Sequence, residues 1–104
     1  MRSNLTFDFG EQALTKQNGT IRIENGDAGF SAYFATPGNG GHVAVVVLQE
    51  IFGVNANIRG IVDELANAGY AAIAPDLYWR TEPDVELDPS SETDRAKALG
   101  VVGI

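Results

Sequence analysis

The fold class follows from one stretch, VAVVVLQEIFGVN (residues 43–55). Its first six residues, 43–48, are apolar without interruption and mostly β-branched, which is typical of a buried strand in a mostly parallel sheet. We therefore expect a central strand that is covered on both faces. Glu50 lies two residues after this run, at the carboxyl end of the expected strand and before a helix, which is where open α/β sheets bind ligands.

A helix is expected over residues 56–68, because apolar residues recur there with the i, i+3, i+4, i+7 spacing of a buried stripe, at Ile58, Ile61, Val62 and Leu65. Asn55 or Asn57 is a suitable N-cap, and Gly69 stands where a left-handed residue commonly ends a helix. Gly60 lies inside the helix, and we expect it to allow close packing against the sheet.

Further strands are expected on both sides of this unit. Polar and apolar side chains alternate over residues 20–24, and residues 30–35 are mostly apolar, so both segments predict strands. The Gly- and Asn-rich residues 25–29 between them predict a hairpin. Residues 70–74 predict the strand after the helix. The order is a β-hairpin followed by β-α-β, which indicates an α/β fold with a right-handed crossover. A last helix is expected from about residue 91 to 99, ending before Gly100.

The composition excludes several functions. The 104 residues carry 14 acids and 7 bases, a net charge of −7, so nucleic acid is not an expected partner. There is no cysteine for disulfides, thiolate metal sites or thiol catalysis. No secretory signal or bilayer-spanning run is visible, which predicts a cytoplasmic protein. Six acids with no base among them predict a solvated loop: Glu82, Asp84, Glu86, Asp88, Glu92 and Asp94.

Candidate functional residues follow the two strands. Glu50 is costly to bury without partners, so it either takes part in chemistry or hydrogen-bonds the following loop. Asp76 and Arg80 follow the next strand and can reach the same crevice, although Asp76 also suits a turn cap and Arg80 a surface position. Tyr78 and Trp79 either line an apolar pocket or pack the loop.

A nucleophile is not evident. The only histidine, His42, precedes its strand, which argues against a catalytic role. Residues 38–41 are rich in glycine but also precede the strand, so they are not read as a phosphate loop. No serine has the flanking glycines of a nucleophile elbow: Ser3, Ser31, Ser90 and Ser91. Covalent acyl transfer by this chain alone is therefore not expected.

The motifs QEIFGVN (49–55), AGYAA (68–72) and APDLYWR (74–80) resemble those of the dienelactone hydrolases, or carboxymethylenebutenolidases, which have the α/β-hydrolase fold. The resemblance covers roughly residues 18–98. It implies that Glu50 interacts with a nucleophilic thiol and that the Ile51 backbone N–H contributes to the oxyanion hole. It also implies that Arg80 holds a substrate carboxylate. We expect Phe52 and Tyr78 to join Arg80 in binding the substrate.

The family's Cys, Asp and His, which come later in its members, are missing. We therefore expect residues 1–17 to form an arm and 18–104 to form the N-terminal part of an α/β-hydrolase domain, from a truncated, frameshifted or fragmentary chain that is inactive alone. The expected substrate is a lactone or ester with a carboxylate, and no cofactor or metal is predicted. The alternative is a non-catalytic module that binds small carboxylates or self-assembles, for instance as a homodimer through an open sheet edge.

Overall fold

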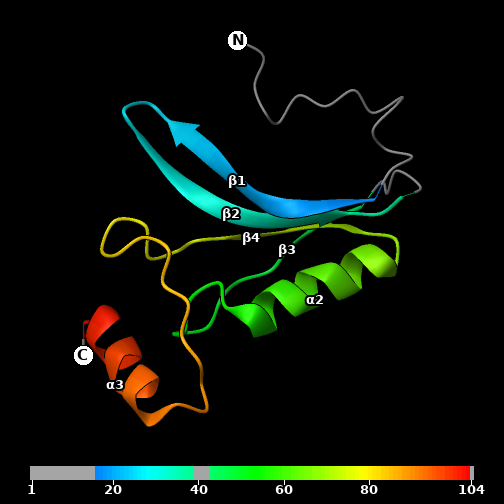
Figure 1. The fold of residues 1–104 in the computed structure, drawn as a ribbon. Helices are drawn as coiled ribbons and strands as arrows, with labels where there is room; N and C mark the ends of the chain where they lie inside the picture. The colour runs from blue at the N-terminus through cyan, green and yellow to red at the C-terminus, as the bar shows by residue number, and fades with distance from the viewer. Residues whose placement is uncertain (1–15, 39–42, 104) are drawn as a thin grey trace.

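The computed structural model describes residues 16–38 and 43–103 (Figure 1). His42 and most of the predicted arm lie outside these residues. The described elements, in chain order, are β1 (Gln17–Asn25), β2 (Ala28–Thr36), β3 (Ala44–Val46), α2 (Ala56–Asn67), β4 (Ala71–Pro75) and α3 (Glu92–Val101). No helix in the described part of the chain is long and apolar enough to cross a membrane, and the cytoplasmic location stays a prediction.

The strands form one mixed sheet in the order β1-β2-β4-β3. β1 and β2 are an antiparallel hairpin whose two-residue turn contains Gly26, at φ +63°. β4 pairs antiparallel with β2, where Phe34 lies opposite Ile73, and parallel with β3, where Val45 lies opposite Ala72. The crossover between β3 and β4 is α2. The predicted order of a hairpin followed by β-α-β is therefore confirmed, with both hairpin strands longer than expected.

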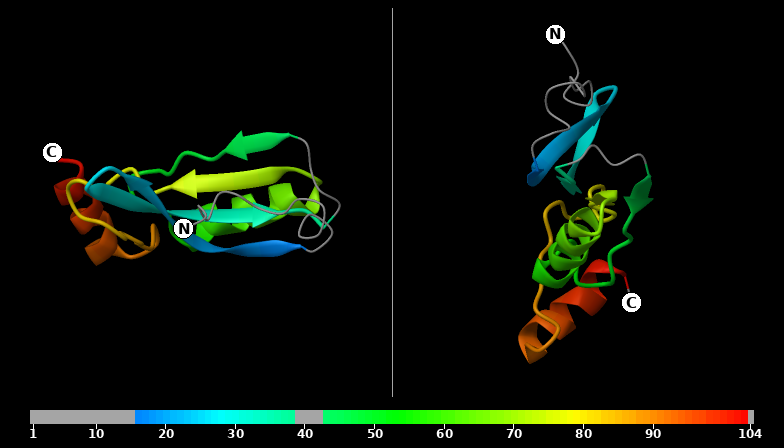
Figure 2. Two further views of the ribbon diagram at one scale, coloured as in Figure 1. Left: turned by 90° about the horizontal axis from the view of Figure 1, so that it is seen from above. Right: turned by 90° about the vertical axis from the view of Figure 1, so that its right-hand side faces the viewer.

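α2 packs along one face of the sheet, as Figures 1 and 2 show from three directions. Its buried residues Ile58, Val62 and Ala66 meet small residues of β2 and β4, namely Ala35, Ala72 and Ala74. Alanines on the strands let the helix approach the sheet closely, and Val62 is completely buried. Among the described residues, no helix lies against the opposite face of the sheet.

The prediction of a central strand over residues 43–48 is wrong for the described chain. Only Ala44–Val46 forms a strand, and it lies at the edge of the sheet beside β4. Val46 and Leu48 are 60% and 65% exposed. An apolar run of this kind fits a strand with neighbours on both sides and cover on both faces, whereas the described residues supply one neighbouring strand and one covering helix.

The ends of α2 are formed by the residues that the sequence predicts, whereas Gly60 does not have its predicted role. Asn55 is the N-cap, and Gly69 has φ +102° directly after the C-cap. A Cβ placed on Gly60 would meet no atom within 4 Å, so the expected close packing at this glycine is wrong. α3 begins after its N-cap Ser91 and continues through Gly100 to Val101, beyond its predicted end. The extension places Val101 against a second apolar cluster.

That second cluster gives the acidic segment a structure. Val85 and Leu87 are buried with Ala98 of α3, so apolar side chains alternate with the exposed acids. Glu82 pairs with Lys97 at 3.0 Å, and Glu86 pairs with Arg59 at 2.7 Å. Five of the six acids are exposed as predicted, whereas Asp94 is half-buried, and Glu92 and Asp94 lie in the first turn of α3 and not in a loop. The acidic segment is also attached to both helices.

Candidate functional site

The turn after β3 is shaped by Gly53. Its N–H donates to the Glu50 carbonyl at 3.1 Å, and its φ of +80° lies in the left-handed region. A Cβ at this position would come within 1.9 Å of the Val85 carbonyl oxygen. Only glycine therefore permits both the turn and its direct contact with the 85–87 segment.

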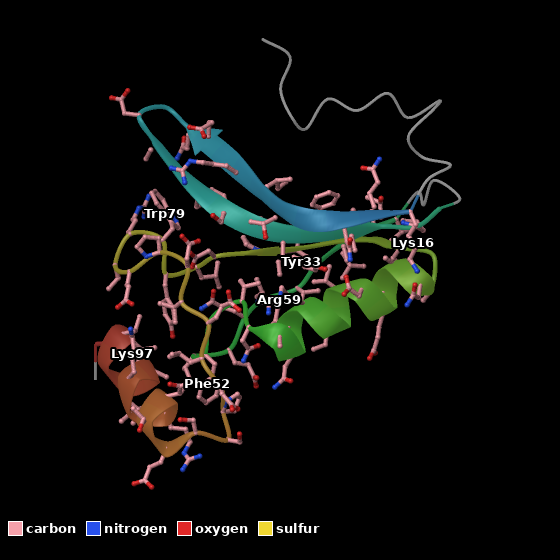
Figure 3. The ribbon with its side chains drawn as sticks, in the orientation of Figure 1. Lys16, Tyr33, Phe52, Arg59, Trp79 and Lys97 are labelled. Carbon is pink, nitrogen blue, oxygen red and sulfur yellow. The ribbon has the colours of Figure 1, made fainter. Side chains whose placement is uncertain are left out.

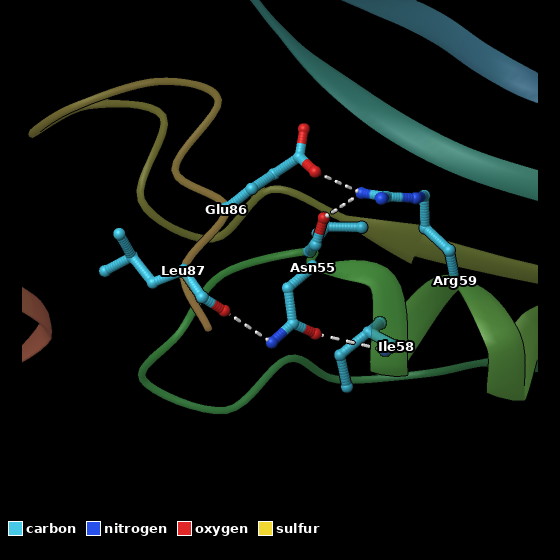
Figure 4. Close-up of polar contacts among 6 residues, drawn as sticks. Asn55, Ile58, Arg59, Glu86 and Leu87 are labelled. Atoms are coloured by element: carbon cyan, nitrogen blue, oxygen red, sulfur yellow. Dashed lines mark hydrogen bonds and ion pairs between the residues drawn. The ribbon is translucent and has the colours of Figure 1, made fainter. Parts of the chain in front are cut away.

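The start of α2 is attached to the same segment, as Figure 4 shows. The Asn55 side chain is buried; its Oδ1 caps the helix by accepting from the Ile58 N–H at 3.1 Å, and its Nδ2 donates to the Leu87 carbonyl at 2.9 Å. Arg59 donates from Nη1 to both the Val54 carbonyl and the Glu86 carboxylate. One residue, Asn55, thus fixes the helix start and the loop together.

The segments that follow β3 and β4 hold each other through reciprocal hydrogen bonds. The Gln49 Oε1 accepts from the Leu77 N–H at 2.9 Å, and the Tyr78 hydroxyl donates to the Ile51 carbonyl at 2.8 Å. Burial raises the pKa of the Tyr78 hydroxyl above its usual value, so it remains a donor at neutral pH. Each segment therefore supplies one side chain that binds the backbone of the other.

Glu50 and Ile51 are both exposed at this turn. In the described part of the chain, the Glu50 carboxylate has no hydrogen bond or ion pair, and the Ile51 N–H has no hydrogen-bond partner. The Ile51 carbonyl, in contrast, is held by Tyr78. The turn therefore presents an exposed backbone donor, the Ile51 N–H, whose own peptide is held through the Glu50 carbonyl by the Gly53 N–H, and beside it the exposed Glu50 carboxylate.

Phe52 and Tyr78 pack against the second apolar cluster, beside Val85 and Leu87. The Phe52 carbonyl accepts from the Leu87 N–H at 2.9 Å, and Figure 3 shows Phe52 near α3, on the side of the sheet that carries both helices. Their predicted contact with substrate stays a prediction. What the structure adds is that both residues help to fix the turn that carries Ile51.

Arg80 is exposed, and its guanidinium lies 4.6 Å from the centroid of the Trp79 ring. No hydrogen bond or ion pair joins it to Glu50 within the described residues. Asp76 is buried and accepts from the Tyr78 N–H at 2.9 Å and the Asp84 N–H at 2.8 Å, so it caps the turn after β4. The interpretation of Asp76 as a turn residue is therefore confirmed.

Sequence reasoning missed the residues that build the turn from a distance. Asn55 was recognised as a helix cap but not as a donor to Leu87. Arg59 was not considered, and Glu86 was named only as one of six acids in a solvated loop. Their contacts join positions about 30 residues apart, and no periodicity indicates them. Within the described residues, no group of three His, Cys, Asp or Glu side chains is placed to hold a metal ion.

A hairpin followed by β-α-β in a mixed sheet, with polar groups gathered where β3 and β4 end, corresponds to part of an α/β-hydrolase-type fold. The chain belongs to the dienelactone hydrolase family, whose model matches residues 30–103.

Individual relatives agree. The carboxymethylenebutenolidase of Pseudomonas sp. strain P51 is 43% identical over 76 residues, which is 73% of this chain and 32% of that protein. The carboxymethylenebutenolidase of Pseudomonas putida is 45% identical over 69 residues, which is 66% of this chain and 29% of that protein. A crystal structure of a proposed dienelactone hydrolase from Klebsiella pneumoniae has a TM-score of 0.60 at 41% identity, covering 66% of this chain and 30% of that one. The chain thus spans about a third of the length of these relatives.

Proposed function

We propose that this chain supplies the N-terminal part of a hydrolase site for lactones or esters that carry a carboxylate. The observation that carries the proposal is the Ile51 N–H, which is unpartnered in the described residues while the carbonyl of the same residue is held by Tyr78. Within residues 18–104, which we take as the hydrolase-like part after an arm of 1–17, Ile51 is the oxyanion donor.

The neighbouring groups take complementary roles. In hydrolysis of an ester or lactone, a nucleophile adds to the carbonyl carbon and negative charge develops on the oxygen, where a preorganised N–H stabilises it in the transition state. Glu50, one residue before this donor, is placed to tune a nucleophilic thiol. That thiol must come from outside these residues, because the sequence has no cysteine. Arg80 binds the substrate carboxylate through its planar fork of N–H donors.

A chimaera provides the test. The 76 aligned residues of this chain replace their counterparts in the carboxymethylenebutenolidase of Pseudomonas sp. strain P51, and hydrolysis of a carboxylate-bearing lactone is compared with that of its uncharged carboxamide analogue. We expect turnover, with loss of the preference for the charged lactone in Arg80→Ala and a lower kcat in Glu50→Ala. A folded chimaera without turnover, or one whose preference survives Arg80→Ala, would contradict the proposal.

For the 104 residues alone we expect no turnover, because no nucleophile elbow is present. The same lactone is offered to the isolated chain and to a Glu50→Ala, Arg80→Ala double variant. Equal rates are the expected result. Hydrolysis by the parent above the double variant would show that these residues contain a nucleophile that the sequence reading missed.

One observation favours a second function, self-assembly. β3 lies at the sheet edge, and Val43, Val46 and Leu48 are 56%, 60% and 65% exposed. An apolar edge strand is a template for pairing with a second copy. Sedimentation velocity of the parent and a Val46→Lys variant tests this: a parent dimer that Val46→Lys converts to monomer supports a homodimer through β3, whereas a monomeric parent excludes it.

A further inference from the structure

We propose that Trp79, which packs against Phe30, is a positioning residue. Its ring holds the Arg80 guanidinium where the N–H groups are free to bind the carboxylate of a small organic ligand. The inference rests on the proposed function and deepens it: Arg80 is the group that binds the carboxylate, and the Trp79 ring determines where Arg80 lies. The observations that carry it are the stacking of three side chains and the partners of the described basic residues.

The ring of Trp79 packs against the ring of Phe30. Its centroid lies 5.7 Å from that of Phe30, which belongs to β2, and the two rings are tilted by 32°. Figure 3 shows Trp79 beneath the turn end of the β1-β2 hairpin. The backbone beside the ring is also fixed, because the Asp76 N–H donates to the Ser31 carbonyl at 2.9 Å. The loop that carries Trp79 is therefore attached to the residue next to Phe30.

Arg80 rests on this ring. Its Cζ is 4.6 Å from the Trp79 ring centroid, within the range of a cation–π contact. In the face-on stacking that arginine adopts on aromatic rings, the N–H groups lie in the guanidinium plane and remain available for a carboxylate, which they bind in a bidentate fashion.

Arg80 differs from the other five described basic residues in what it contacts. Each of those five contacts an oxygen atom: Lys16 that of Asn67, Arg22 that of Glu24, Arg59 that of Glu86, Arg95 that of Pro89 and Lys97 that of Glu82. Arg80 contacts only a ring within the described residues. The chain has a net charge of −7, and the nearest acid in sequence, Glu82, is already paired with Lys97. Within the described residues the guanidinium therefore lies on the Trp79 ring with no carboxylate to neutralise it.

The ligand class follows from these two groups. A single cation with free in-plane donors selects a monocarboxylate, and the indole beside it offers apolar surface to the carbon skeleton of an organic acid. Cyclopentanecarboxylate is a suitable probe, because its ring matches the size of a five-membered lactone. Cyclopentanecarboxamide is its uncharged control.

The experiment follows the Arg80 Nε–Hε resonance of the 104-residue chain by NMR while each probe is added. Three variants are compared with the parent: Trp79→Leu, Trp79→Tyr and Arg80→Ala. Circular dichroism and urea unfolding establish that each variant is folded. In the free parent, the Trp79 ring current shifts the Arg80 side-chain resonances, and this shift should disappear in Trp79→Leu and be partly retained in Trp79→Tyr.

We expect cyclopentanecarboxylate, but not the carboxamide, to move the Arg80 resonance with saturation. Trp79→Leu should raise Kd about two- to fivefold, the range of one exposed cation–π contact, and Trp79→Tyr should restore part of the affinity. Unchanged Arg80 shifts or an unchanged Kd in Trp79→Leu, with binding still lost in Arg80→Ala, would overturn the role of Trp79 and leave the proposed role of Arg80 intact. If the parent does not bind the carboxylate, or binds it as well after Arg80→Ala, the role of Arg80 fails and that of Trp79 fails with it.

Discussion

The hydroxyl of Tyr78 donates a hydrogen bond of 2.8 Å to the carbonyl of Ile51. It joins the segment after β4 to the turn after β3, two segments that are far apart along the chain. The hydrogen bond fixes the carbonyl of the residue whose N–H we propose as the oxyanion donor. Since Tyr78 also packs against Val85 and Leu87, the orientation of this backbone depends on the second apolar cluster.

Tyr78→Phe should destabilise the chain by about 1 kcal/mol, the usual contribution of one hydrogen bond. The ring still packs, so the loss comes from the hydroxyl and from an unpaired Ile51 carbonyl. Urea unfolding measures the change, and faster amide exchange at residues 49–53 should accompany it. Tyr70→Phe is the matched control, because that tyrosine is 40% exposed. Equal stability of the two variants would show that the Tyr78 hydroxyl has no structural role.

Stability should fall at alkaline pH because of two tyrosines. Burial, and for Tyr33 also its hydrogen bond with Asp63, raises the pKa of Tyr33 and of Tyr78 above 10.0. The folded state therefore holds these protons more tightly than the unfolded state, so the stabilisation is complete below pH 10 and is lost as pH rises through the folded pKa values.

Urea unfolding at pH 9 and pH 11 tests this. The double variant Tyr33→Phe, Tyr78→Phe should lose less unfolding free energy over the interval than the parent does. If the parent and the double variant lose equal unfolding free energy between pH 9 and pH 11, the alkaline loss does not come from these two tyrosines.

Two glycines should respond to alanine in opposite directions. Gly53→Ala combines φ +80° with a Cβ only 1.9 Å from the Val85 carbonyl oxygen, so it should destabilise by more than about 2 kcal/mol or prevent folding. Gly60→Ala meets open space inside α2 and should stabilise by up to about 1 kcal/mol. Thermal unfolding of both variants measures the difference. A tolerated Gly53→Ala would mean that the turn and the 85–87 segment are not in contact.

Asn55 should be needed for both of its hydrogen bonds. Asn55→Ala removes the cap of α2 and leaves the Leu87 carbonyl unpaired, at a cost of about 2 kcal/mol in unfolding free energy. Asn55→Ser keeps a capping oxygen on a side chain too short to donate to the Leu87 carbonyl, so its cost should be smaller. The exposed Asn57→Ala serves as control. If Asn55→Ser is as stable as the parent, the contact with Leu87 contributes nothing.

The features that the sequence predicts correctly are local ones. The hairpin, the helix with its Asn55 cap and the strand after it depend on periodicity and on residues a few positions apart. The position of β3 depends on which strands lie beside it, so the apolar composition of residues 43–48 indicated a central strand where the described chain has an edge.

For the candidate site, the sequence indicated individual residues but not the contacts that hold them in place. Glu50 was singled out by its place after a strand and by the family motif, Ile51 by the motif alone, and Arg80 by its place after the next strand, its charge and the motif. The contacts that hold the turn join Asn55 to Leu87 and Arg59 to Glu86, and they arise only when the acidic segment folds back over the helix start. Sequence spacing carries no signal for such contacts.

The most direct test of the central claim, that Ile51 is the oxyanion donor, is the kcat of the chimaera for a carboxylate-bearing lactone with and without the Ile51 N–H. Ile51→Pro removes that donor, whereas Ile51→Val retains it. We predict a kcat about 100- to 1,000-fold lower in a folded Ile51→Pro chimaera, the effect of losing one oxyanion-hole donor, and an unchanged kcat in Ile51→Val. A folded Ile51→Pro chimaera that retains the parent kcat would contradict the account.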